Sequence, residues 1–212
     1  IAAGWLGASV FVGGVSSSVT PADSTASTPA DNATSEQEIA VDLGDGVILE
    51  MVRIPDGWFA VPPLPSGTSV CPDAYRPQIV AISRPFYMGK YEVTQQQWEA
   101  VMGSNPSKFP GPNNPVNCIS WSQSQEFARR LNEKVQDSRR VFHIPTDIEW
   151  EYACYADAKK DHDYSGAILR KHAWIETNSE RSLHPVGQKE PNGWGLYDML
   201  GNVEEACTWW AE

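Results

Sequence analysis

The stretch Pro191-Asn192-Gly193-Trp194-Gly195-Leu196-Tyr197-Asp198-Met199, followed by Gly201-Asn202-Val203, decides how this chain is interpreted. Its Asn-Gly pair and further glycines permit tight turns with positive φ, so the stretch predicts ordered loop rather than helix or strand. Trp194 lies at its centre and can bury a large apolar area, as can Trp121 and Trp150 earlier in the chain. We expect these three tryptophans to fill the core.

The composition fits one globular domain with a polar tail. The chain has 212 residues, 41% of them hydrophobic, with nine tryptophans, 16 glycines and 16 prolines. This apolar content excludes disorder of the whole chain. The abundance of tryptophan, glycine and proline favours a loop-rich α+β domain over a helical bundle.

The net charge of −11 is unevenly distributed. Residues 1–52 hold seven of the 27 acidic residues and none of the 16 lysines and arginines. The remainder of the chain is therefore only mildly acidic, without a basic excess that would hold phosphate groups. We expect no nucleic-acid partner.

Three segments are predicted along the chain. Residues 1–15 are uncharged and small or apolar. This segment is shorter than the roughly 20 residues that a membrane-spanning helix needs. We interpret it as the remnant of a signal sequence or membrane anchor rather than as a disordered leader. Residues 16–44, rich in Ser, Thr and Pro, predict a disordered linker. Residues 45–212 would form the folded domain, incomplete at its C-terminus. This layout predicts an extracytoplasmic protein, exported or membrane-anchored, that meets the membrane only through its N-terminal segment.

Local patterns predict three short strands and three helices in the folded domain. Apolar runs bounded by turn residues predict strands at 47–55, 78–83 and 86–91, and Asp56-Gly57 predicts a turn that leads into residues 58–61. Each helix begins at a Ser or Thr N-cap, and the caps are Thr94, Ser120 and Thr146. After residue 157, glycines and prolines interrupt any longer element, so we expect mostly loop there.

The cysteines and histidines show no local metal-binding or redox motif. Cys71, Cys118, Cys154 and Cys207 are far apart and form no Cys-x-x-Cys pair, which excludes zinc-ribbon and thioredoxin interpretations. The four histidines form no His-Glu-x-x-His sequence. Cys118 and Cys154 lie beside aromatic residues in predicted elements, where a small buried cysteine is common.

Further strings stand out along the folded domain, and in order they are Arg84-Pro85-Phe86-Tyr87-Met88-Gly89-Lys90-Tyr91-Glu92-Val93-Thr94, Asn114-Pro115-Val116 with Ile119-Ser120-Trp121, Ile144-Pro145-Thr146 with Glu149-Trp150-Glu151-Tyr152-Ala153, His184-Pro185-Val186-Gly187, and the two strings quoted first. Taken together over about residues 45–212, they resemble the formylglycine-generating enzyme (sulfatase-modifying factor) family. The resemblance implies a variant of the C-type-lectin fold: α+β, with a small β-sheet, about three flanking helices and much irregular loop.

The chemistry implied by this resemblance is oxidation of a cysteine in a Cys-x-Pro-x-Arg sulfatase peptide to formylglycine. It uses oxygen, copper and two enzyme cysteines, and a thiolate pair suits Cu(I), a soft ion. In the family this pair lies well after the Gly-Asn-Val string, so we expect it beyond Glu212 and assign no catalytic residue here. Copper is expected only in a complete catalytic member.

The resemblance also implies a structural calcium site after the Gly-Asn-Val string. Family members usually continue Asn-Val-Trp-Glu-Trp, where the Asn and Glu side chains and nearby carbonyls supply the oxygen ligands that calcium prefers. Here Asn202 and Glu205 keep those residue types, while Glu204 and Ala206 replace the two tryptophans. Asn202 and Glu205 are therefore candidate metal ligands, and the alternative is a turn beside a solvated acidic patch.

Three functions compete at this point. The first is a formylglycine-generating oxidoreductase acting on a sulfatase-like protein or peptide, although the chain as given is not expected to be catalytic. The second is a non-catalytic, exported, lectin-like module that binds or scaffolds another extracytoplasmic protein or a carbohydrate, and the anchor-and-linker layout favours it. The third, an iron-dependent sulfoxide synthase, is disfavoured because the chain has no His-x-x-x-His-x-Glu sequence.

Overall fold

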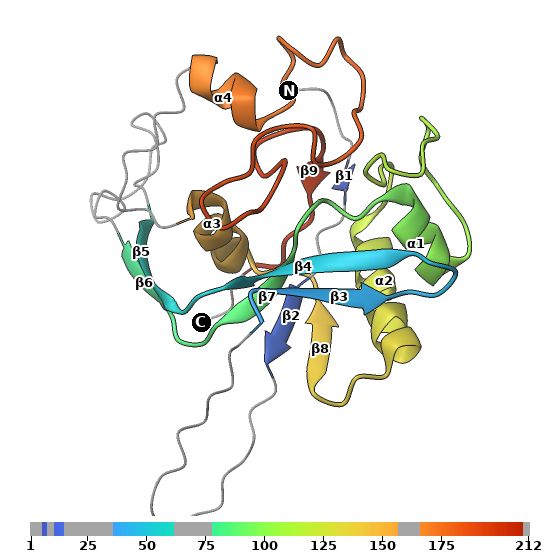
Figure 1. The fold of residues 1–212 in the computed structure, drawn as a ribbon, viewed down its shortest axis with the longest axis horizontal. Coiled ribbons are helices and arrows are strands. Elements are labelled where there is room, and N and C mark those ends of the chain that lie inside the picture. The colour runs from blue at the N-terminus through green and yellow to red at the C-terminus, as the bar shows by residue number, and fades with distance from the viewer. Residues whose placement is uncertain (1–5, 8–10, 15–35, 62–77, 157–165, 210–212) are drawn as a thin grey trace, which may run out of the picture.

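A five-stranded antiparallel sheet organises the protein (Figure 1). The computed structural model describes residues 6–7, 11–14, 36–61, 78–156 and 166–209. The strand order is β3-β4-β7-β2-β8, and the strands are β2 (Phe11–Gly14), β3 (Glu38–Asp42), β4 (Ile48–Ile54), β7 (Phe86–Gly89) and β8 (Arg140–His143).

The strand β4 separates two hydrophobic clusters because both of its faces bury apolar side chains, although Ile48 and Glu50 near its start are exposed. Leu49 and Met51 point into the first cluster, and Val52 and Ile54 belong to the second. Side chains alternate between the two faces of a strand, so a mostly apolar strand is expected where both faces are covered. The strands predicted at 47–55, 78–83 and 86–91 are confirmed by β4, β6 (Gln78–Ile82) and β7. Residues 58–61, expected only to follow a turn, lie in β5 (Gly57–Val61).

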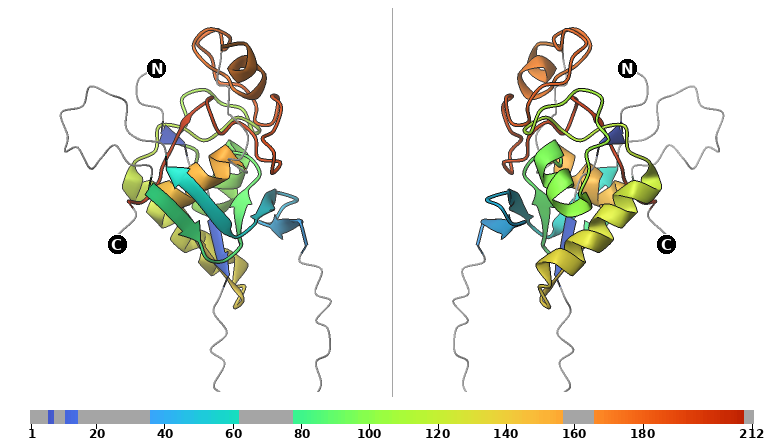
Figure 2. Two further views of the ribbon diagram at one scale, coloured as in Figure 1. Left: turned by 90° about the vertical axis from the view of Figure 1, so that its left-hand side faces the viewer. Right: turned by 90° about the vertical axis from the view of Figure 1, so that its right-hand side faces the viewer.

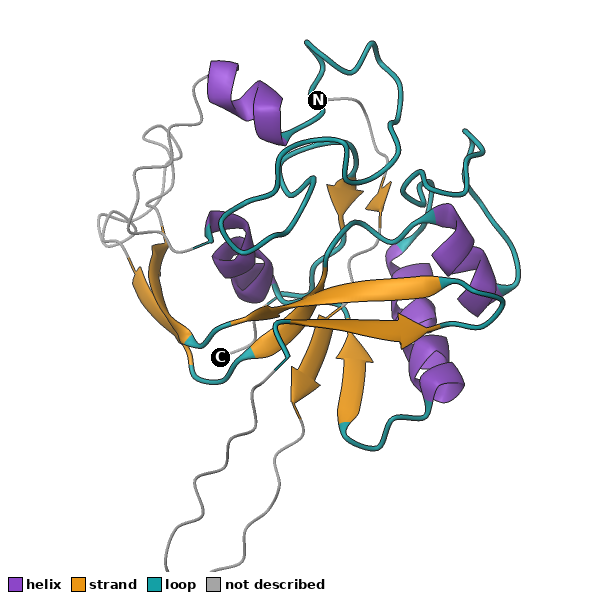
Figure 3. Cartoon of the chain, in the orientation of Figure 1, coloured by secondary structure: helices purple, strands orange, loops and turns teal. Residues whose placement is uncertain are grey.

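Two small sheets and four helices complete the described part of the chain (Figure 3). The strands β5 (Gly57–Val61) and β6 (Gln78–Ile82) form an antiparallel pair, and β1 (Leu6–Gly7) pairs with β9 (Glu204–Glu205) in parallel. The helices are α1 (Gln95–Met102), α2 (Trp121–Val135), α3 (Asp147–Tyr155) and α4 (Gly166–His172). Helix α2 lies beside α1 and β8, as the side views in Figure 2 show.

The helix starts follow the sequence prediction. Thr94, Ser120 and Thr146 are the N-caps of α1, α2 and α3, and each has a complete capping box. In such a box the cap side chain accepts a hydrogen bond from the third helical N–H, and the third residue's side chain accepts one from the cap N–H. Helix α4 was not expected, because the sequence after residue 157 was interpreted as loop.

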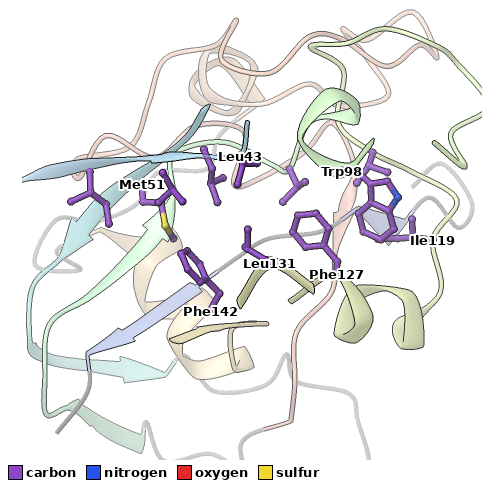
Figure 4. Packing of buried hydrophobic residues seen from close by; sticks show 12 residues of the cluster. Leu43, Met51, Trp98, Ile119, Phe127, Leu131 and Phe142 are labelled. Atoms are coloured by element: carbon purple, nitrogen blue, oxygen red, sulfur yellow. The ribbon is translucent and has the colours of Figure 1, made fainter. Parts of the chain in front are cut away.

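The first hydrophobic cluster lies between the sheet and helices α1 and α2 (Figure 4). Trp98 stacks on Phe127 with ring centroids 4.9 Å apart, and both residues are buried. The expectation that Trp121 fills the core is wrong, because Trp121 is the first residue of α2 and is 38% exposed. Trp150 and Trp194 are half-buried.

The folded part begins earlier in the chain than the sequence indicated. The strand β3 lies inside the range 16–44 that was assigned to a disordered linker, and its alternating pattern buries Ile39 and Val41. Phe11–Gly14, within the expected leader 1–15, pairs with β7 and β8 in the central sheet. An anchoring role for residues 1–15 stays a prediction, and within the described residues no helix is long and apolar enough to cross a membrane. Residues 16–35 lie outside the described part.

Thr146→Ala should lower the free energy of unfolding by ~1 kcal/mol. Thr146 Oγ1 accepts from the Glu149 N–H at 3.2 Å, so the substitution removes the cap of α3. Thermal unfolding measures the change, with Thr177→Ala as control because Thr177 is an exposed threonine that caps none of these helices. Equal unfolding midpoints for the two variants would contradict the capping role.

Candidate functional site: a buried acidic cluster

Glu92 fastens the C-terminal loops to the core. It follows β7 and is only 1% exposed. Its Oε2 accepts a hydrogen bond from Asn202 Nδ2 at 2.9 Å, and its Oε1 accepts one from the Val203 N–H at 3.0 Å. A buried carboxylate is tolerated only when such donors replace its lost hydration, so the loop that carries Asn202 is held in one place.

Asn202 joins two loops through all of its polar atoms. Besides Glu92, its Nδ2 donates to the His184 carbonyl at 3.0 Å, and its Oδ1 accepts from the His184 N–H at 3.1 Å. Asn202 has a φ of 67°, a left-handed conformation that asparagine tolerates better than most residues. Gly201 is required beside it, because a Cβ there would overlap the backbone oxygen of Trp174.

Asp198 contributes a carboxylate with one unused oxygen. Its Oδ2 accepts from the Gly187 N–H at 2.7 Å, whereas its Oδ1 is buried without a hydrogen-bond partner. Burial raises the pKa of Asp198, while the Gly187 hydrogen bond and the charges of Lys189 and His184 lower it. An unpartnered buried carboxylate oxygen is uncommon in proteins and indicates that something else can bind there.

Glu205 is the third carboxyl of the cluster. Trp150 Nε1 donates to its Oε2 at 3.0 Å. Burial raises the pKa of Glu205 to about 7, against that hydrogen bond and with a further contribution from Asp198. The pKa of Glu92 is raised well above its ordinary value by burial and then by the charges of Glu205 and Asp198. We refer to Glu92, Asp198 and Glu205 as the acidic cluster.

The fit of calcium differs between the two residues named from sequence. The polar atoms of the Asn202 side chain form hydrogen bonds with Glu92 and His184, and these bonds connect two loops. Glu205 lies close enough to Asp198 for the two to repel each other, and Asp198 has the unpartnered oxygen. Within the described residues no group of three His, Cys, Asp or Glu side chains is arranged to hold a metal. The assignment of Asn202 and Glu205 as calcium ligands stays a prediction, and Asp198, with its unpartnered oxygen, is a further oxygen donor near Glu205.

The thiols of Cys154 and Cys207 are not activated. Cys154 is buried, and burial, followed by the charges of Glu205 and Glu151, raises the pKa of its thiol to about 12. Burial and the same Glu205 raise the pKa of Cys207 to about 12. A nucleophilic or copper-binding cysteine needs the opposite change, toward thiolate. Cys118, expected to be buried, is half-exposed, and Cys71 lies outside the described residues.

A family model for the sulfatase-modifying factor enzyme 1-like domain matches residues 44–212. The chain belongs to this family. The family and the α+β fold expected from sequence are thereby confirmed. The solved structure of Treponema denticola variable protein 1 superimposes with a TM-score of 0.68 and 26% identity, covering 85% of this chain and 77% of that one. PvdO from Pseudomonas aeruginosa gives a TM-score of 0.56 at 25% identity, covering 73% and 68%.

The proteins with similar sequences include a chaperone protein and several formylglycine-generating enzymes. The chaperone protein LppX of Paenibacillus barcinonensis is 32% identical over 174 residues, covering 59% of this chain and 62% of LppX. The formylglycine-generating enzyme of Streptomyces coelicolor is 29% identical over 127 residues, covering 53% and 38%. That of Mus musculus is 26% identical over 136 residues, covering 53% and 34%. This chain thus spans less than two thirds of the length of each of these relatives.

Sequence reasoning missed two members of the acidic cluster. Glu92 and Asp198 both lie in strings that were quoted for the resemblance, but neither was named as a candidate site residue. Glu92 lies 110 positions before Asn202, and only the fold brings them into contact. The signal that was present is an acidic residue inside an otherwise apolar or aromatic string, Tyr-Glu-Val for one and Tyr-Asp-Met for the other.

Asn202→Asp should destabilise the fold by about 3 kcal/mol, because it replaces a donor to two buried acceptors with a carboxylate facing Glu92. Chemical denaturation measures the loss. Asn202→Ser serves as the matched comparison, since it removes the same bonds without adding charge and should cost less. If Asn202→Asp were as stable as the wild type, the role of Asn202 in holding the two loops together would be wrong.

Proposed function

We propose that this protein is a non-catalytic member of its family whose function is to bind another polypeptide. The observation that carries the proposal is the outer face of the β5–β6 hairpin. Trp58 pairs with Ala81 and Ala60 with Ile79, so these four apolar side chains lie on one face. All four are exposed, with Trp58 at 63% and Ile79 at 72%.

The hairpin is held so that this face remains open. Phe59, on its opposite face, is buried and packs against Tyr152 of α3 with ring centroids 5.5 Å apart. An anchored two-stranded sheet with an apolar outer face offers both contact area and strand edges to an extended polypeptide. The chaperone name of one relative is consistent with such a partner.

The chain should suppress the aggregation of reduced insulin, measured by light scattering. Trp58→Ser combined with Ile79→Ser should remove most of this effect, because the variant loses most of the exposed apolar face. Val141→Ser is the control, since Val141 is 53% exposed on β8, away from the hairpin. Full suppression by the hairpin variant, or none by the wild type, would refute the proposal.

The same preparation should leave a Cys-x-Pro-x-Arg peptide unmodified when copper, oxygen and a thiol reductant are supplied. Mass spectrometry detects the aldehyde directly. An aldehyde product that disappears in Cys118→Ser or Cys154→Ser would place the family's oxidation chemistry in this chain and favour the enzyme function instead.

Calcium would bind at the acidic cluster as a structural ion. Asp198 and Glu205 would hold it, and its positive charge would offset their mutual repulsion. Its role would be to fix the loops around Asn202 rather than to take part in a reaction.

Calcium should raise the thermal unfolding midpoint of the wild type relative to a sample with EGTA. At a hundredfold excess over the dissociation constant the gain in stability is about 2.7 kcal/mol. Asp198→Asn and Glu205→Gln should each lose the shift, whereas Asn202→Ser should keep it from a lower starting midpoint. An unchanged wild-type midpoint would exclude the ion, and a shift lost in Asn202→Ser but kept in Asp198→Asn would restore Asn202 as a ligand.

A further inference from the structure

Two adjoining hollows lie along helix α3, on the side away from its contact with the β5–β6 hairpin. The first, of about 460 Å³, is lined by Asp147, Trp150, Glu151, Cys154, Tyr155, Leu200 and Cys207. The second, of about 330 Å³, shares Asp147 and Cys207 with the first and continues past Trp121, Thr208 and Trp209. We call the two together the α3 groove.

Two carboxylates on one face of α3 give the α3 groove its negative charge. Asp147 and Glu151 are four residues apart and therefore neighbours on one face of α3. Burial and then the charge of Asp147 raise the pKa of Glu151. None of the salt bridges found among the described residues involves Glu151, and no described Lys, Arg or His lines either hollow. Within the described residues the groove thus carries carboxyl groups and no cationic side chain.

Aromatic rings form the other walls of the groove. Trp150 and Tyr155 line the first hollow, and the Trp150 ring is fixed by its hydrogen bond to Glu205. Trp121 and Trp209 line the second hollow and are exposed, Trp209 at 90%. A carboxylate attracts an organic cation through its charge, and a neighbouring aromatic ring attracts it through its quadrupole. The ring also contacts the apolar alkyl stem that carries the cationic group.

We propose that the α3 groove binds a lysine or arginine side chain of an extended partner polypeptide. The cationic head lies between Asp147 and Glu151 in the first hollow, with its stem against Trp150 and Tyr155. The neighbouring residues of the partner lie along Trp121 and Trp209 in the second hollow. A free small amine would fill only the first hollow, so the adjoining second hollow is the reason to expect a polypeptide. This site is separate from the β5–β6 face and does not depend on it.

Isothermal titration calorimetry with three probes tests the proposal. The probes are acetyl-Gly-Gly-Lys-Gly-Gly-amide, the same peptide with norleucine in place of lysine, and n-butylamine. The lysine peptide should bind, and the norleucine peptide, which keeps the stem but lacks the charge, should bind about tenfold more weakly or not at all. Butylamine should bind more weakly than the lysine peptide. Equal binding of butylamine would overturn the polypeptide assignment, and equal binding of norleucine would overturn the cation site.

Two single substitutions locate the site. Glu151→Gln should weaken the lysine peptide about fivefold, while Glu99→Gln should leave its affinity unchanged, because Glu99 is an exposed carboxylate on α1 that lines neither hollow. Circular dichroism and unfolding midpoints check that both variants fold. The Trp58→Ser and Ile79→Ser variant should bind the peptide normally, which separates failure of this inference from failure of the proposed function. No detectable binding of the lysine peptide, or no effect of Glu151→Gln, would refute the site.

Discussion

The hydrogen bonds from Asn202 and Val203 to the buried Glu92 carboxylate constrain the structure more than any other interaction described above. Residues 173–208 contain little regular secondary structure, so few of their backbone groups are satisfied by a helix or a sheet. They need fixed partners elsewhere, and Glu92 supplies one from the end of the sheet. Through Asn202 the same constraint reaches His184, and through Gly201 it requires the close approach to Trp174. The loop that carries Asn202 and Val203 is held because both oxygens of the buried Glu92 carboxyl accept hydrogen bonds from it.

This arrangement has an energetic cost that explains the chemistry of the cluster. The carboxyls of Glu92, Asp198 and Glu205 all have a raised pKa in the folded state, for which burial is the first cause. A raised pKa means that stability is lost as the pH rises through the folded-state value, about 7 for Glu205. A cation at Asp198 and Glu205 would offset that loss at neutral pH, whereas hydrogen bonds already serve Glu92. Glu92 thus has a donor to each of its two oxygens, whereas Asp198 and Glu205 each accept one described side-chain or backbone hydrogen bond.

The sequence predicts the parts of the fold that depend on neighbouring residues. The N-caps Thr94, Ser120 and Thr146 were found because capping chemistry lies within four positions. The strand β3 was missed although its alternation was visible, because it adjoins a long polar segment. Glu92, a member of the acidic cluster, was missed for a stronger reason: it lies 110 positions from its partner Asn202, and no local pattern reveals such a contact. The misplacement of Trp121 has the same origin, since size predicts burial only where the fold offers a cavity.

The two departures from the family pattern after Val203 have different consequences in this structure. Glu204 is exposed on β9, so a carboxylate there costs no desolvation. Ala206 is 2% exposed and packs in a small cluster with Ala128 and Ile144, a space formed by small and medium-sized side chains. Ala206 also lines the second hollow beside α3, of about 330 Å³, so the small side chain at this position borders open space on one side. The Trp150 ring, with its hydrogen bond to Glu205, then remains as an aromatic wall of the α3 groove.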